Sequence, residues 1–125
     1  LPSGDPMTVA VGFETRHPVD DVVFAVAILN DANENIYSAN TSILGLEPQR
    51  LSGRGNATFR FPSVSLLDGS YKLHVGAHSL DGRVSHDHNR DCTFVVSSDT
   101  KAAGIVDLAP EAVISIAGAE QRATG

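Results

Sequence analysis

The sequence predicts an all-β domain built as an antiparallel β-sandwich. Apolar residues alternate with polar ones in several short segments, which is the period of a strand with one buried face. Turn-forming residues separate these segments about every ten residues, as they do in sandwiches. No amphipathic helical pattern lasts longer than about two turns. The 125 residues suit one domain with its own core.

The first half of the chain supplies an amphipathic strand, a fully apolar strand and a hairpin partner. Residues 7–13 alternate strictly, and we expect Pro18 to close this region. Residues 22–29 (VVFAVAIL) are apolar on both faces, which predicts a central strand covered on both sides. The polar residues 30–35 (NDANEN) then form a turn, and residues 36–41 return beside the apolar strand.

The second half is predicted to alternate loops with shorter strands. The stretch 42–56 is rich in Gly and reads as a loop with at most one helical turn. Further strands are expected at residues 57–61, ended by Pro62, and at residues 71–79, 92–96 and 113–116. Residues 118–125 are small and polar, so we expect a domain over residues 1–117 followed by a flexible tail.

Composition and motifs argue against several classes of function. The net charge of -6 would repel the phosphates of nucleic acids and anionic membrane surfaces. Cys92 is the only cysteine, which excludes an internal disulfide and favours a reducing compartment. The sequence lacks an initiator Met, a signal peptide and the run of about 20 apolar residues that a membrane helix needs, and it reads as a piece of a longer protein.

The usual catalytic signatures are also missing from the sequence. It contains no P-loop, GxSxG, HExxH or GxGxxG motif, so we expect no enzyme and no cofactor. Asp31-x-Asn33-x-Asn35 resembles the start of a calcium loop, but Ile36 and Ser42 stand where that loop requires Gly and Glu. The adjacent carboxylates Asp20 and Asp21 would face opposite sides of a strand, which makes them a poor acid–base pair.

The densest polar cluster is His86-Asp87-His88, with Asp91 close by. One interpretation is a Zn or Mn site, since residues 86 and 88 would point the same way on a strand. The other is a structured loop whose His and Asp side chains hydrogen-bond to the backbone. We favour the loop and predict no metal, because the spacing offers no third ligand. A small metal-dependent enzyme stays open as a rival.

A polar sheet face is the best candidate for a binding surface. His74 and His78 share one face of the predicted 71–79 strand, about 13 Å apart, and Lys72 joins them. The opposite, apolar face of this strand carries Tyr71, Leu73 and Val75. The other strands add small residues to the polar face, namely Ala10, Gly12, Ala25 and Ala27. The alternative, a plain solvent face or a surface for a partner, is given equal weight.

Such a shallow face suits a glycan, held through hydrogen bonds to its hydroxyls without a deep pocket. We therefore predict glycan-binding residues on it, and no catalytic residues. The predicted binding residues are His74, His78, Lys72, Arg60 and Ala27.

The order of motifs resembles the C-terminal domain of Wzt-type ATPase subunits, which drive ABC export of O-antigen and similar bacterial polysaccharides. The likeness spans about residues 3–97 as an ordered set. It comprises Asn40-Thr41 after the hairpin, a Gly-rich lead with Gly53 and Gly55 into Phe59 and Phe61, the turn and strand Leu66, Gly69, Tyr71 and Leu73, and Asp87-His88 before Phe94 and Val96.

The resemblance implies a jelly-roll or immunoglobulin-like sandwich that binds the exported polysaccharide without catalysis. It also implies a homodimer that exchanges the last strand, residues 113–116. The partners would be an ATPase domain and a transmembrane exporter subunit, placing the chain in the cytoplasm at the inner face of the membrane. A structural or adaptor sandwich that contacts another protein through an edge strand is the alternative.

The sequence departs from the family pattern in two places. His86 stands where the family usually has Tyr before Asp87-His88, and the strand that normally precedes the Leu1 region is missing. The missing strand would leave a sheet edge to be covered. Tyr71 begins the buried face, so we assign it to tethering the turn with its hydroxyl and not to ligand binding.

Overall fold

The computed structural model describes the backbone of residues 1–116 and 119–124, and the side chains of residues 1–87 and 91–114. Seven strands and no helix occur in the described part of the chain, which confirms the all-β prediction. None of the described residues forms a helix that could cross a membrane. The strands are β1 (Met7–Asn30), β2 (Asn35–Asn40), β3 (Gln49–Phe61), β4 (Gly69–His78), β5 (Ser85–Val96), β6 (Glu111–Ile116) and β7 (Ala119–Thr124).

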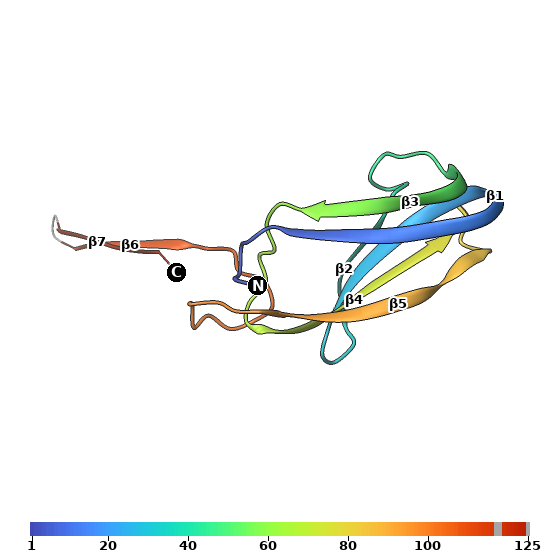
Figure 1. Cartoon of the computed structure of the whole chain (residues 1–125). Coiled ribbons are helices and arrows are strands. Elements are labelled where there is room, and N and C mark those ends of the chain that lie inside the picture. The colour runs from blue at the N-terminus through green and yellow to red at the C-terminus, as the bar shows by residue number, and fades with distance from the viewer. Residues whose placement is uncertain (117–118, 125) are drawn as a thin grey trace.

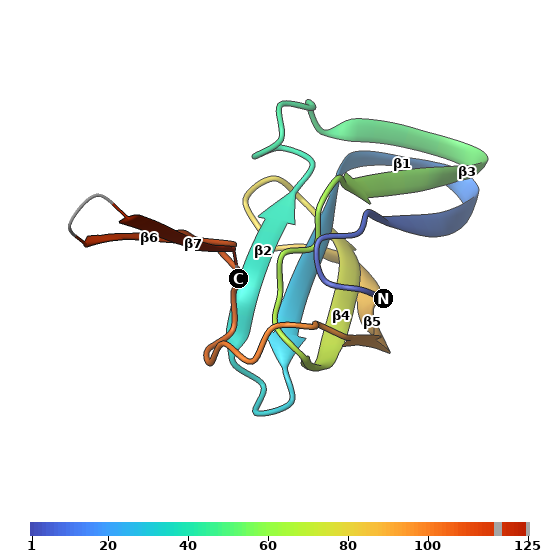
Figure 2. The same cartoon turned by 90° about the vertical axis from the view of Figure 1, so that its left-hand side faces the viewer.

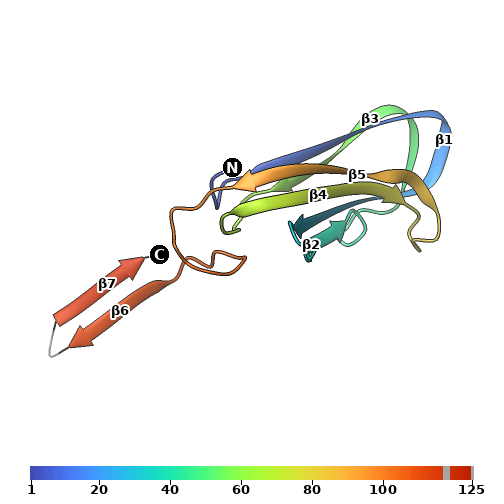
Figure 3. The same cartoon turned by 90° about the horizontal axis from the view of Figure 1, so that it is seen from below.

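The strand β1 belongs to two layers of an open sandwich (Figure 1). Its first half pairs antiparallel with β3, from Met7 opposite Phe61 to Thr15 opposite Gly53, and we call this pair the ribbon. Its second half lies between β2 and β4, and β5 continues the order β2-β1-β4-β5, which we call the four-stranded sheet. The ribbon lies over one face of this sheet, as Figure 3 also shows.

The passage of β1 between the layers occurs around Pro18. The sequence predicts that Pro18 ends the strand, which is wrong: β1 continues to Asn30, with shifts of register between Thr15 and Val19 and between Val19 and Val22. Proline has no N–H to donate, and it is tolerated within a sheet where the ladder is interrupted. Asp21, with a φ of 57°, marks the same irregular corner.

The core lies between the two layers. Val22, Phe24, Val26 and Ile28 of β1 are at most 6% exposed, and they pack with side chains of β3 and β4. Val23, on the opposite face of the same strand, is 1% exposed. The prediction that residues 22–29 form a central strand is confirmed, because β2 and β4 pair with its two edges. The predicted cover on both faces is incomplete, since Ala25, Ala27 and Leu29 on the outer face are only half-buried.

The strand β3 begins at Gln49, well before the residue 57 that the sequence predicts. Gly53 and Gly55, which suggest a loop in the sequence, instead lie in the part of β3 that pairs with β1. Gly53 has a φ of 85°, and its N–H donates to Thr15 Oγ1 at 3.0 Å. Gly55 lies under the ring of Phe13, where a Cβ would come within 2.5 Å of the ring. β5 likewise begins early, at Ser85.

The hairpin of β6 and β7 projects away from the sandwich (Figure 2). The strand β7 occupies residues 119–124, where the sequence predicts a flexible tail. On β6, Val113 and Ile114 point to opposite faces and are 52% and 58% exposed. In the described part of the chain, β6 and β7 pair only with each other. A lone two-stranded hairpin is marginally stable in water, so this one would gain from a partner surface.

Candidate binding surface

The alternation of β4 gives the four-stranded sheet an inner and an outer face. Tyr71 and Leu73 point inward and are 4% and 6% exposed, whereas Lys72 and His74 stand on the outer face. The register then sets one row across the outer face, in which Ala27 is opposite both Ser38 of β2 and His74 of β4. Asp91 of β5 is opposite His74 and extends that row to the sheet edge.

A shallow groove of about 260 Å³ crosses this outer face. Its floor is β1, where the small side chains of Ala25 and Ala27 face outward, and on β4 they lie opposite Gly76 and His74 respectively. The side chains of Ser38 and Asn40 stand on β2, since they are opposite Ala27 and Ala25 respectively. The full lining is Ala25, Val26, Ala27, Ser38, Ala39, Asn40, Ile43, His74 and Val75.

The polar groups around the groove suit hydrogen bonding to an uncharged polyol. His74 Nε2 lies 3.3 Å from Asp91 Oδ1, and the two side chains are 31% and 59% exposed. Asn40 Oδ1 accepts the N–H of Ile43 at 2.8 Å, and its amide N–H groups have no partner among the described residues. The Ser38 hydroxyl accepts from Asn35 Nδ2 at 3.4 Å, which leaves its own hydrogen to donate.

The five predicted binding residues do not come together in one site. His74 and Ala27 line the groove, whereas Lys72 and His78 lie on the same face beyond it. Lys72 Nζ donates to Asn33 Oδ1 in the β1–β2 turn at 2.7 Å, and His78 Nδ1 donates to the carbonyl of Ser79 at 2.6 Å. Both are therefore engaged with the protein itself.

Arg60 lies in the other layer, opposite Thr8 and exposed on the outer side of the ribbon. Ala10 and Gly12 are also in the ribbon, so the predicted single face of small residues is in fact two faces on opposite sides of the sandwich. The reason is that β1 passes from one layer to the other, which alternation within a strand does not indicate.

Sequence reasoning missed Ser38, Asn40 and Asp91 as neighbours of His74. The alternation in residues 36–41 does place Ser38 and Asn40 on one face of a strand. Their approach to Ala27 depends on the register of β1 with β2, and that of Asp91 on the register of β4 with β5. A single sequence does not specify these registers.

A family model described as the Wzt C-terminal domain matches residues 1–108. The chain belongs to the Wzt C-terminal domain family. This family is associated with polysaccharide recognition in ABC exporters, and the matched segment ends before the hairpin β6–β7.

A solved structure supports the fold of the Wzt C-terminal domain. The crystal structure of the C-terminal domain of Wzt superposes with a TM-score of 0.72, at 21% sequence identity, over 86% of this chain and 69% of that one. At this identity the likeness shows the fold, and it confirms the predicted sandwich. No curated protein sequence matches the chain significantly.

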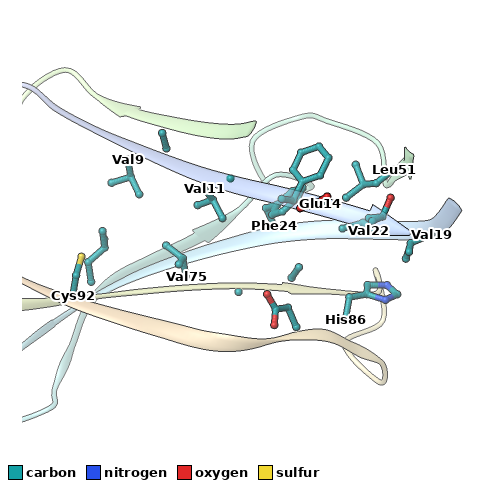
Figure 4. A pocket seen from close by; sticks show the side chains of 18 of the residues that line it. Val9, Val11, Glu14, Val19, Val22, Phe24, Leu51, Val75, His86 and Cys92 are labelled. Atoms are coloured by element: carbon teal, nitrogen blue, oxygen red, sulfur yellow. The ribbon is translucent and has the colours of Figure 1, made fainter. Parts of the chain in front are cut away.

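In this member of the Wzt C-terminal domain family, another cavity lies between the ribbon and the four-stranded sheet. We call it the interior cleft, and its volume is about 830 Å³. Figure 4 shows Val9 and Val11 of β1 across the cleft from Val75 of β4 and Cys92 of β5. Within the described residues, β5 pairs only with β4 and the first half of β1 only with β3. Each therefore has a backbone edge beside the cleft that no described strand covers, although at the end of β5 the Leu1 ammonium donates to the carbonyl of Val95 at 2.9 Å.

The polar cluster at residues 86–91 lies within β5 and not in a loop. His86 Nε2 donates to the carbonyl of Asp21 at 2.9 Å, and Asp91 is paired with His74. Asp87 is opposite Ala77, and the side chain of His88 lies outside the described residues. Among the side chains that are described, no three His, Cys, Asp or Glu residues converge as metal ligands would. The contact of His86 with backbone is the kind that the non-metal interpretation expects.

Proposed function

We propose that this chain is a non-catalytic carbohydrate-binding domain that recognises a bacterial cell-surface polysaccharide, of O-antigen type, for export by an ABC transporter. The observation that carries the proposal is the groove on the outer face of the four-stranded sheet, found in a chain of the Wzt C-terminal domain family. The groove combines a small-residue floor with polar walls, and a pyranose ring has complementary chemistry.

The chemistry of binding follows from the two kinds of surface in the groove. The methyl groups of Ala25 and Ala27 and the exposed side chain of Ile43 offer apolar contact to the C–H groups of a sugar ring. Asn40 and Ser38 offer N–H and O–H donors to the ring hydroxyls. Each hydrogen bond to sugar replaces one to water and contributes about 1 kcal/mol, so affinity for one ring is modest.

Filling the groove tests this proposal. We expect Ala27→Phe to weaken binding of the source organism's surface polysaccharide about tenfold or more in calorimetric titration, because the ring would occupy the space above β1. Ala10→Phe is the matched control, since Ala10 is exposed on the same strand but in the ribbon, and it should bind as the wild type does. A cooperative thermal unfolding transition in each variant checks that both variants fold. The proposal is contradicted if the folded wild type does not bind sugar at millimolar concentration. It is also contradicted if the two variants bind equally well.

The proposed partners follow from membership of the family. We infer that the chain works with an ATPase domain and a transmembrane exporter subunit, at the cytoplasmic side of the cell membrane. The coding sequence immediately before Leu1 tests this inference. A nucleotide-binding domain at that place supports it, and an unrelated domain there contradicts it.

We also propose a homodimer that exchanges the C-terminal strand β6 between protomers. The exposed side chains of Val113 and Ile114 on a projecting hairpin support it, as do the open edges of β5 and of the first half of β1. The same edges favour the alternative function, a structural or adaptor sandwich that binds another protein by strand addition. Sedimentation of the full chain distinguishes the homodimer from the adaptor. A monomer at tens of micromolar protein contradicts strand exchange.

A further inference from the structure

Asn40, at the end of β2, carries a hydrogen-bond donor whose direction is fixed beside the groove. Its Oδ1 accepts the N–H of Ile43 at 2.8 Å, and this bond determines which end of the amide is the oxygen. The amide nitrogen is therefore held on the other side, and its N–H groups have no partner among the described residues. Because Asn40 lines the groove, a ligand there can accept a hydrogen bond from this nitrogen.

Next to this donor stands a large apolar side chain that is exposed to water. Ile43 lines the same groove and is 73% exposed, so an apolar group of a ligand would stabilise the complex by covering it. The loop that carries Ile43 is tied to β2 by its backbone. The N–H of Leu44 donates to the carbonyl of Asn40 at 3.1 Å, and the N–H of Leu46 donates to the carbonyl of Thr41 at 2.9 Å. The donor and the apolar side chain are thus held together before any ligand binds.

The groove has room for one sugar ring with a small substituent at this end. Ala27 lies in one row between Ser38 and His74. The next outward residue of β1, Ala25, is opposite Asn40, and successive outward residues of a strand are about 7 Å apart. The volume of about 260 Å³ lies just below the roughly 300–1000 Å³ of sites for drug-sized ligands. A ring over Ala27 would therefore bring a substituent to the Asn40 end.

Resting on the proposed function, we propose that the groove selects a sugar that carries an acetyl group, as an N-acetylhexosamine does. The acetyl carbonyl accepts a hydrogen bond from Asn40 Nδ2, and the acetyl methyl group packs on Ile43. A carboxylate would supply the acceptor without the methyl group, and a 6-deoxy group would supply the methyl without the acceptor. The hydroxyls of the ring meet Ser38 and His74. Asn40 and Ile43 thus determine which sugar is preferred.

Matched methyl glycosides test this selection. The 2-acetamido derivatives of glucose, galactose and mannose are titrated against the parent hexosides, and the amide NMR shifts of the groove residues give the affinities. The 6-O-acetyl hexosides form a second arm, which separates an amide from an ester as the source of the acetyl group. We expect the best acetylated glycoside to bind about tenfold more tightly than its parent, because the better hydrogen bond and the covered methyl group each contribute roughly threefold.

Two variants assign this preference to its residues. Asn40→Asp keeps the oxygen that accepts the N–H of Ile43 but lacks the donor, so the loop should fold and the preference should fall to about threefold. Ile43→Ser removes the apolar contact and should lower the preference by a similar factor. A cooperative thermal unfolding transition checks that each variant folds.

Each variant has a matched control that should keep the full preference. Asn56→Asp makes the same change in the ribbon, opposite Gly12. Leu46→Ser removes an aliphatic side chain from the same loop as Ile43, where Leu46 is 57% exposed but does not belong to the described lining of the groove.

The outcomes separate this selection from carbohydrate binding as such. If the acetylated and parent glycosides bind in the groove equally well, the selection is overturned while carbohydrate binding stands. The same holds if the preference survives both Asn40→Asp and Ile43→Ser, or if the two controls lower it as much. If no sugar of any kind shifts the groove residues, the proposed function and the selection both fall.

Discussion

Tyr71 ties the turn that precedes β4 to the core. Its hydroxyl donates to the carbonyl of Leu67 at 2.8 Å, and its ring stacks on Phe94 with centroids 5.6 Å apart. This is the tether that the sequence predicts, and it keeps Tyr71 out of the groove. Burial raises the pKa of the Tyr71 phenol above its ordinary value of 10.0, and the nearby carboxylates of Asp68 and Asp31 raise it further.

Tyr71→Phe should lower the free energy of unfolding by about 1–2 kcal/mol, because the buried carbonyl of Leu67 loses its donor. The wild type should also lose stability at high pH. A pKa that is higher in the folded state contributes stability that is fully present below the unfolded value near pH 10. This contribution is lost as the pH rises through the folded pKa. Urea denaturation from pH 7 to 11 checks both effects; an unchanged unfolding free energy in Tyr71→Phe contradicts the tether.

At the residue scale, the sequence predicts the direction in which a side chain points better than it predicts the residues that the side chain contacts. The alternation in β4 correctly sets Tyr71 and Leu73 inside, with Lys72 and His74 outside. The pairing of His74 with Asp91 has no signal in the sequence, because the two residues are brought together by the register of β4 with β5. The bond from Lys72 to Asn33 depends on the β1–β2 turn in the same way.

At the scale of elements, errors in the predicted strands concentrate at Pro and Gly. Pro18 lies inside β1 and not at its end, and Gly53 and Gly55 lie inside β3. These residues usually interrupt secondary structure, but in this fold they mark a corner, a bulge and a close ring contact. The physical cause is tertiary pairing, which overrides a local signal for a loop.

The hairpin β6–β7 should matter for assembly and not for sugar binding. Deleting residues 111–125 removes both of its strands, and the family match ends before it, at residue 108. We expect the shortened chain to sediment as a monomer and to keep its affinity for polysaccharide, because the groove is built from β1, β2 and β4. A shortened chain that stays dimeric argues against strand exchange. Lost affinity in a folded monomer means that the groove depends on the partner copy.

At the scale of the whole molecule, the fold class follows from the sequence but the layering does not. Short alternating segments with frequent turns are sufficient to predict an antiparallel sandwich. That one strand, Met7–Asn30, serves both layers is a property of its pairing with β3 on one half and with β2 and β4 on the other. This division explains why Arg60 and Ala10 lie across the molecule from Ala27.

The most direct measurement is a map of backbone amide NMR shifts as the source organism's polysaccharide is added to the full chain. If the outer face of the four-stranded sheet binds the glycan, the largest shifts will fall on Ala25, Ala27, Ser38, Asn40 and His74, while Thr8, Ala10 and Arg60 of the ribbon stay unchanged. Shifts confined to the ribbon or to the interior cleft, or no shifts at saturating polysaccharide, would contradict this account.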